Sequence, residues 1–150
     1  MKFLDKIIEL MHQYQISYQL IEFELTESMF VNNTKAVKEY LNEMRQLGLS
    51  VSIDDFGSGY SSLNILASVP ANVIKLDRVF LYENKQQNRE LIKHLVKMLK
   101  NLNFSIVAEG VETVEQMAFL RNVGCDIAQG YFLSKPLPKL EFENLLKLKV

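Results

Sequence analysis

The sequence predicts an α/β fold, built either as an open parallel sheet or as a (β/α) barrel. Short apolar segments with strand character recur roughly every twenty to thirty residues, and amphipathic helical segments separate them. The 150 residues are 48% apolar, which is enough for one core and predicts a single domain over residues 1–150. Closed barrels of this class take ~250 residues. The chain offers about five strands rather than eight, so part of a barrel is missing or the sheet is open.

The first half of the chain is expected to supply two helices and two strands in alternation. Asn33 or Thr34 is placed to cap the second helix, and Gly48 is expected to end it in the left-handed conformation. The expected elements are a helix with its apolar face from Phe3 to Met11, a strand over residues 21–26, a helix with apolar residues from Val37 to Met44, and a strand over residues 51–53.

The second half continues the same alternation. Thr113 opens a Thr-Val-Glu-Gln capping box, and the helix that it begins is expected to run to about Asn122 and to meet Gly124. The expected strands cover residues 73–76, 105–108 and 127–132, and a closing helix covers residues 140–148. A longer helix lies between the first two of these strands, with an expected apolar stripe of Leu91, Ile92, Leu95, Leu99 and Leu102.

Composition excludes several classes of protein. Seventeen basic and eighteen acidic residues leave no net basic field, so a DNA or RNA polymer is not an expected partner. Cys125 is the single cysteine, which rules out an internal disulfide and favours a reducing, cytoplasmic setting. No apolar run approaches the length of a membrane-spanning segment.

Acidic residues stand where the first two expected strands end, and parallel α/β folds build their sites at those ends. Glu24 lies within the first strand and Glu27 follows it, although alternating glutamate and apolar residues also describe a half-exposed strand. Asp54 and Asp55 end the second strand and lead into a glycine-containing loop. Two adjacent carboxylates in a cleft repel each other unless a cation holds them ionised, and such hard oxygen ligands suit Mg²⁺ or Mn²⁺. A turn without metal is the alternative interpretation.

The later strands carry a lysine, two further carboxylates and an amide. Lys75 interrupts an apolar strand and shares a face with Asp77. It is either a solvent-facing lysine on an edge strand or, in a barrel mouth, a cation for a phosphate group. Glu109 ends the next strand, while Glu112 lies near a helix N-terminus, where an acid complements the helix dipole. Gln129 in the last strand can bind a ligand or satisfy a neighbouring polar group.

Five motifs follow one another along the chain: Glu-Leu-Thr-Glu-Ser, Asp-Asp-Phe-Gly-Ser-Gly-Tyr-Ser-Ser-Leu, Ile-Lys-Leu-Asp-Arg, Ala-Glu-Gly-Val-Glu-Thr and Gly-Cys-Asp-Ile-Ala-Gln-Gly-Tyr. In their order and spacing, they resemble the successive signatures of the EAL family over nearly the whole chain. The resemblance implies a TIM-barrel-like phosphodiesterase, here a partial barrel, that hydrolyses cyclic di-GMP to linear pGpG in bacterial second-messenger signalling. It also implies that the enzyme uses Mg²⁺ or Mn²⁺ and that Ca²⁺ inhibits it.

The resemblance also implies roles for the residues that would do the chemistry. Glu24 and Asp54 match metal ligands, and Asp55 matches the carboxylate that binds a second metal ion and takes part in catalysis. Glu109 matches a catalytic or metal-associated glutamate. Lys75 matches a catalytic lysine near the attacking water, where removal from solvent would lower its pKa.

The remaining matched positions surround that centre. Glu27 matches the residue that holds the glycine-containing loop of residues 56–63 in place. Asp77, Glu112 and Gln129 match positions that line the substrate.

The resemblance covers the C-terminal part of the family pattern. The Glu-Ala-Leu signature, the arginine after it and an asparagine-bearing strand are absent from the sequence. We therefore expect a single incomplete EAL domain over residues 1–150. Three interpretations stay open: a fragment of a phosphodiesterase that is weak or inactive alone, a binding or regulatory module that acts through protein contacts, and an unrelated α/β metalloprotein. Either of the first two would leave exposed sheet edges for a second copy or for the missing half-domain.

Overall fold

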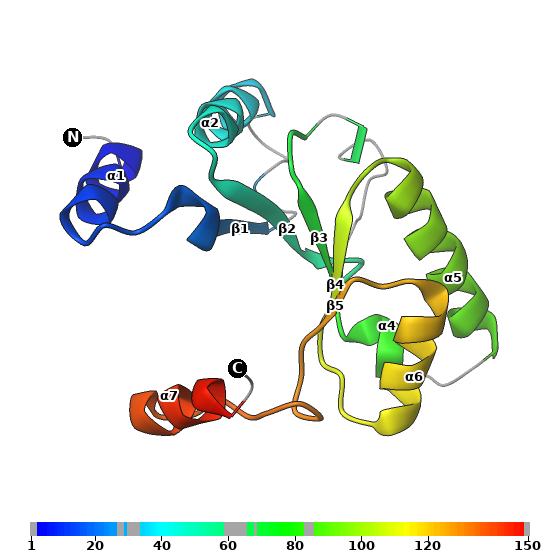
Figure 1. Cartoon of the computed structure of the whole chain (residues 1–150). Helices are drawn as coiled ribbons and strands as arrows, with labels where there is room; N and C mark the ends of the chain where they lie inside the picture. Colours follow the sequence, from blue (N-terminus) through cyan, green and yellow to red (C-terminus); the bar gives the residue numbers. More distant parts are fainter. Residues whose placement is uncertain are drawn as a thin grey trace.

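The computed structural model describes residues 3–26, 29, 34–58, 66–67, 69–82 and 86–148. In these ranges all strand pairs are parallel, and the strands follow one another across a single sheet in the order of the sequence (Figure 1). The α/β class is therefore confirmed. The strands are β1 (Glu22–Thr26), β2 (Ser50–Phe56), β3 (Val73–Leu76), β4 (Ser105–Ala108) and β5 (Ile127–Ala128).

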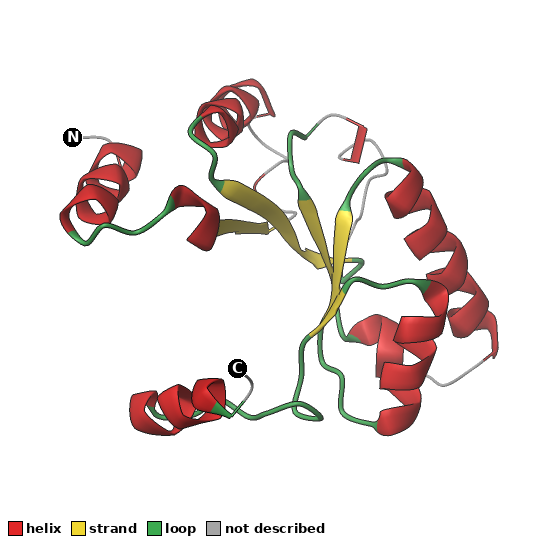
Figure 2. Ribbon diagram, viewed as in Figure 1, coloured by secondary structure: helices red, strands yellow, loops and turns green. Residues whose placement is uncertain are grey.

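Helices alternate with the strands, and Figure 2 shows them around the sheet. α2 packs on β2, α5 packs on β4, and α5 and α6 lie side by side. None of the described helices is long and apolar enough to cross a membrane. The helices are α1 (Phe3–Gln13), α2 (Thr34–Gln46), α4 (Val79–Tyr82), α5 (Gln86–Asn101), α6 (Val114–Val123) and α7 (Lys139–Lys147), with a 3₁₀ turn η1 (Tyr18–Leu20) before β1.

The core lies between the sheet and its helices. Ile53, Ile74 and Ile106 are paired in register across β2, β3 and β4 and are fully buried. From α5, Val96 and Leu99 pack in the same cluster. Burying each large aliphatic side chain contributes ~1.5–3 kcal/mol. Because side chains alternate along a strand, this buried row fixes which face of β3 carries Lys75, the residue after Ile74.

The helix ends follow the predicted signals. Gly48 and Gly124 have φ angles of 85° and 86°, the left-handed conformation expected after α2 and α6. The Thr113 hydroxyl oxygen accepts a hydrogen bond from the Gln116 amide at 3.2 Å, which confirms the capping box. Thr34 is the first residue of α2, whereas Asn33 lies outside the described residues.

Two predicted elements are wrong in part. The last strand ends at Ala128 instead of residue 132, because the chain turns there and the Leu133 amide donates to the Gly130 carbonyl at 3.0 Å. The segment between β3 and α5 contains a short helix, α4, that was not predicted.

The apolar stripe predicted for the long helix is confirmed in part. Ile92, Val96 and Leu99 are the buried residues of α5, whereas Leu91 and Leu102 are 54% and 48% exposed. Of the predicted stripe, Ile92 and Leu99 are buried and Leu95 packs against the core, so the prediction is wrong only for Leu91 and Leu102.

Candidate functional site

Lys75 is buried at the centre of the carboxyl-end face of the sheet. It is 5% exposed, and β3 lies in the middle of the strand order, so the interpretation of a solvent-facing edge lysine is wrong. The Lys75 Nζ lies 2.7 Å from Glu24 Oε1, 2.8 Å from Asp54 Oδ1 and 2.9 Å from Glu109 Oε1. One ammonium group thus joins carboxylates from β1, β2 and the end of β4.

The three carboxylates control the protonation of this lysine. Burial alone would lower the pKa of Lys75, but its contacts with Asp54, Glu24 and Glu109 outweigh burial and raise the pKa above its ordinary value. The expected lowering of the lysine pKa is therefore wrong. Lys75 is a fixed positive charge at neutral pH.

A β-bulge places both aspartates of β2 beside Lys75. Ile53 pairs with Ile74 and Phe56 pairs with Leu76, so Asp54 and Asp55 together stand against the single residue Lys75. Asp55 has a φ angle of 53°, a left-handed conformation that aspartate tolerates better than most residues. Regular alternation would send two neighbouring side chains to opposite faces. The bulge instead turns both carboxylates toward one side.

These two aspartates and Glu109 form a group with the composition of a divalent cation site. One carboxylate oxygen from each of Asp54, Asp55 and Glu109 lies within 4.8 Å of the others. Asp54 Oδ1 is buried, and apart from its ion contact with Lys75 it accepts no well-directed hydrogen bond from the described residues. Such an oxygen has lone pairs available for a cation, and oxygen donors suit Mg²⁺ or Mn²⁺. Glu24 lies outside this group and reaches it through Lys75.

The negative charge gathered here alters Asp55. Its partial burial, the neighbouring charges of Asp54 and Asp77, and a hydrogen bond with the Asp77 carboxyl together raise the pKa of Asp55. Asp77 is itself held in place, because its Oδ1 accepts a hydrogen bond from the Val79 amide at 2.7 Å at the start of α4. A bound cation would relieve the repulsion among these carboxylates.

A cleft of about 460 Å³ opens beside the carboxylates. It brings together the predicted residues Asp55, Asp77, Glu109, Glu112 and Gln129. Two further side chains of this cleft were not predicted as site residues, although each belongs to one of the motifs quoted above. These are Arg78, which follows Asp77, and Tyr131, which follows Gly130.

A glycine permits the close backbone approach behind this cleft. A Cβ atom at Gly130 would lie 2.2 Å from the Val111 carbonyl oxygen, so no other residue fits without moving the backbone. The Val111 amide donates to the Gln129 carbonyl at 3.0 Å, and this contact fixes the chain at Gln129.

The predicted glycine-containing loop is described only in part. Residues 59–63 and Glu27, the residue expected to hold the loop, lie outside the described residues. At the start of the loop, the Ser58 hydroxyl donates to the Asp55 carbonyl at 2.8 Å and closes the turn after the bulge. Gly57 has a φ angle of 97° and lies against the Phe80 ring, where a Cβ atom would approach to 2.2 Å.

Fold and site together define an α/β protein of barrel type, with carboxylates and a buried lysine gathered at the carboxyl ends of parallel strands. The sequence pattern of the EAL domain matches residues 1–136, and the chain belongs to the EAL domain family. Cyclic di-GMP phosphodiesterase NbdA of Pseudomonas aeruginosa is 38% identical over 145 residues, which are 95% of this chain and 18% of that protein. Cyclic di-GMP phosphodiesterase PdeR of Escherichia coli is 37% identical over 141 residues, which are 93% of this chain and 21% of that protein.

Solved structures share the fold. The EAL domain of Mycobacterium smegmatis DcpA superposes with a TM-score of 0.91 at 32% identity, over 97% of this chain and 66% of that chain. The cyclic di-GMP complex of the PaMucR phosphodiesterase gives a TM-score of 0.84 at 34% identity, over 93% of this chain and 57% of that one. A manganese and cyclic di-GMP complex of Klebsiella pneumoniae BlrP1 gives a TM-score of 0.82 at 27% identity, over 89% of this chain and 34% of that chain. The chain spans about a fifth of the length of the two curated relatives above.

Proposed function

We propose that this chain is the C-terminal part of an EAL domain and that, within a complete domain, it contributes most of a site that hydrolyses cyclic di-GMP to linear pGpG. The observation that carries the proposal is the convergence of Asp54, Asp55 and Glu109 on the buried Lys75 at the carboxyl ends of the strands. Relatives at 37–38% identity are named cyclic di-GMP phosphodiesterases, which supports this substrate. The single Cys125 is compatible with a cytoplasmic signalling protein.

Carboxylates of the site would hold Mg²⁺ or Mn²⁺. Asp54, Asp55 and Glu109 offer oxygen atoms close enough to share a cation, Glu24 is a further proposed ligand, and Asp55 is the carboxylate proposed to bind a second ion. When bound, divalent ions supply a water that loses its proton near neutral pH and neutralise charge on the phosphoryl oxygens. Glu24 lies within β1, Asp54 and Asp55 lie in the second half of β2, and Glu109 directly follows β4, so the sheet sets the spacing of the proposed ligands.

In this proposal, Lys75 orients the reacting groups. Its ammonium, held by Glu24, Asp54 and Glu109, directs a positive charge toward the attacking water. The water oxygen forms a bond to phosphorus while one phosphodiester P–O bond breaks. One water proton passes to a carboxylate of the site, and the leaving sugar oxygen takes up a proton. The product is the linear dinucleotide, which carries a phosphomonoester at one end and a free hydroxyl at the other.

The cleft beside the carboxylates would receive the dinucleotide. Asp77, Glu112 and Gln129 line it and offer hydrogen-bonding groups to the substrate, and Arg78 places a cation among them. Glu27 is proposed to hold the adjoining loop. The cleft of about 460 Å³ lies within the usual size range of small-molecule sites, ~300–1,000 Å³.

A second candidate is a catalytically inactive EAL-like module that acts through protein contacts. Two observations favour it: among the described residues β1 and β5 each pair with one strand, and the aligned part is 66% of the DcpA EAL domain chain. Unpaired strand edges template further pairing, so the proposed partner is a second copy of the chain or the missing N-terminal half-domain. A strictly monomeric species in sedimentation at high concentration would contradict self-association.

Hydrolysis of cyclic di-GMP with Mn²⁺ separates these candidates. The assay compares three proteins: the chain alone, its Asp54→Asn variant and a longer polypeptide with an upstream EAL half-domain. The matched control is Glu39→Gln on the exposed face of α2. We expect turnover to be weak in the chain alone, strong in the longer polypeptide and lost when Asp54→Asn is placed there. Mn²⁺ binding followed by electron paramagnetic resonance should weaken in Asp54→Asn and stay unchanged in Glu39→Gln. Binding of cyclic di-GMP without turnover in every form would favour the regulatory module.

A further inference from the structure

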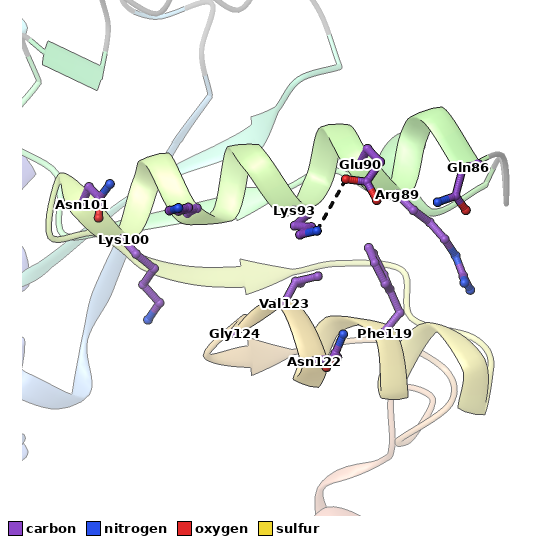
Figure 3. A pocket seen from close by; sticks show the side chains of 11 residues that line it. Gln86, Arg89, Glu90, Lys93, Lys100, Asn101, Phe119, Asn122, Val123 and Gly124 are labelled. Atoms are coloured by element: carbon purple, nitrogen blue, oxygen red, sulfur yellow. Dashed lines mark ion pairs between the residues drawn. The ribbon is translucent and has the colours of Figure 1, made fainter.

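A second hollow lies on the outer side of the fold, between α5 and α6, and it shares no residue with the carboxylate cleft. It has a volume of about 620 Å³. Figure 3 shows side chains from successive turns of α5 along one wall, with Phe119 and Asn122 of α6 on the other. We call it the α5–α6 groove.

The α5–α6 groove is strongly basic although the whole chain has a net charge of −1. Its lining contains Arg89, Lys93, Lys97 and Lys100 against a single acid, Glu90. The four basic residues recur at spacings of three and four, so they follow one face of α5. Like charges at this spacing repel one another along a helix, so an external acidic partner would relieve this repulsion.

Internal partners neutralise only part of this charge. Lys93 lies 3.6 Å from Glu90, and Lys100 forms a salt bridge with Asp126. Arg89 stacks over the Phe119 ring, 5.1 Å from its centroid, and Figure 3 shows Arg89 of α5 and Phe119 of α6 in the space between the two helices. Within the described ranges, Arg89 and Lys97 contact no carboxylate. A guanidinium stacked on an aromatic ring keeps the N–H groups at its edge directed outward for a carboxylate.

The shape of the groove selects the class of ligand. Residues 86–101 of α5 contribute lining from end to end, a length of ~22 Å at the rise of an α-helix. A compact anion such as a mononucleotide would meet only one or two of the basic side chains. A helix laid along the groove with acidic residues three and four apart would meet all of them, and an apolar side chain between them would contact Phe119 and Val123.

We propose that the α5–α6 groove binds an acidic α-helical segment of another domain or protein, through Arg89, Lys93 and Lys97. The site is independent of the proposed phosphodiesterase chemistry, because it lies on the helical layer outside the sheet and contains none of the residues of the carboxylate cleft.

Fluorescence anisotropy on the full chain tests this binding. The probe is a labelled, alanine-based helical peptide of about sixteen residues with four glutamates three and four residues apart and one leucine between them. The matched peptide has glutamine in place of each glutamate. The protein variants are Lys93→Glu/Lys97→Glu and, as a control of equal charge change, Lys139→Glu/Lys147→Glu on α7. The milder Lys97→Gln covers the case in which the charge reversal unfolds the protein, which circular dichroism would reveal.

We expect the glutamate peptide to bind at least about tenfold more tightly than the glutamine peptide, with an affinity that falls as salt rises. Lys93→Glu/Lys97→Glu should weaken binding about tenfold or more and Lys97→Gln about threefold, while the α7 control stays within about twofold. Equal binding of the two peptides, or equal losses in the groove and α7 variants, would overturn the proposal. Displacement of the peptide by GMP, with GMP binding lost in Lys97→Gln, would also overturn it in favour of a nucleotide site.

Discussion

Replacing Lys75 with methionine should destabilise the metal-free protein by about 3 kcal/mol. Methionine fills a similar volume, so packing is largely kept and the change removes the charge. Glu24, Asp54 and Glu109 would then face one another without their shared partner. Carboxylates in such a group repel, and protonating or hydrating them costs free energy.

The magnitude follows from the geometry of the three contacts. At 2.7–2.9 Å, each ion pair has an attraction of ~6 kcal/mol at an effective dielectric constant of 20, and dehydration of the charges offsets much of it. Removing one partner of a fully buried pair costs ~3–5 kcal/mol. The Glu24 side chain is 50% exposed and those of Asp54 and Glu109 are 20% exposed, so water relieves part of the repulsion and the lower end of that range applies.

Urea unfolding in EDTA and in Mn²⁺ checks this number. In EDTA, Lys75→Met should lose about 3 kcal/mol of unfolding free energy, whereas Lys35→Met on the exposed side of α2 should change it by less than ~0.5 kcal/mol. In Mn²⁺ the loss should shrink, because a cation replaces the missing charge. A loss below ~1 kcal/mol in EDTA would refute the view that Lys75 holds the carboxylates together.

Two further predictions concern residues next to β5. Gly130→Ala should lower the free energy of unfolding in urea by ~3 kcal/mol, because its Cβ would clash with the Val111 carbonyl. Gly124 has open space around it but a positive φ, so Gly124→Ala should lower this free energy by ~1 kcal/mol. Equal losses in the two variants would contradict the contact of Gly130 with Val111. Desolvation raises the pKa of Asp126, but Lys100 and a backbone amide outweigh it and lower that pKa. Asp126→Asn should therefore lower the free energy of unfolding by ~1 kcal/mol at pH 7. This difference from wild type should vanish as the pH falls from ~3.9, the ordinary pKa of aspartate, through the lowered pKa of Asp126. A difference in unfolding free energy that does not change with pH would contradict a stabilising role of the Asp126 charge.

Much of the fold could be predicted because its strands are short apolar runs with clear boundaries. The strands over residues 73–76 and 105–108 have the predicted bounds. Parallel strands bring their carboxyl ends to one edge, so the meeting of Asp55 with Glu109 also followed from the pattern. The last strand was predicted too long, since the tight contact of Gly130 with Val111 joins residues that the sequence pattern does not relate.

The inner geometry of the site depended on tertiary pairing. Alternation along a strand predicts opposite directions for Asp54 and Asp55, and only the register between β2 and β3 reveals the bulge that reunites them. The environment of Lys75 depended on strand order, because the same apolar segment with one lysine fits an exposed edge or a buried centre. The face of α5 that would be buried was likewise decided by its packing against β4.

The sequential strand order also bears on how the chain folds. Paired residues in neighbouring strands lie about 20 to 30 positions apart along the chain, so no ladder requires a distant segment to arrive first. The loop-closure entropy is therefore similar for each ladder, because it grows only slowly with loop length. As the chain emerges from the ribosome, each new strand and its helix can pair with the edge strand already formed, because only a short stretch of chain separates successive strands.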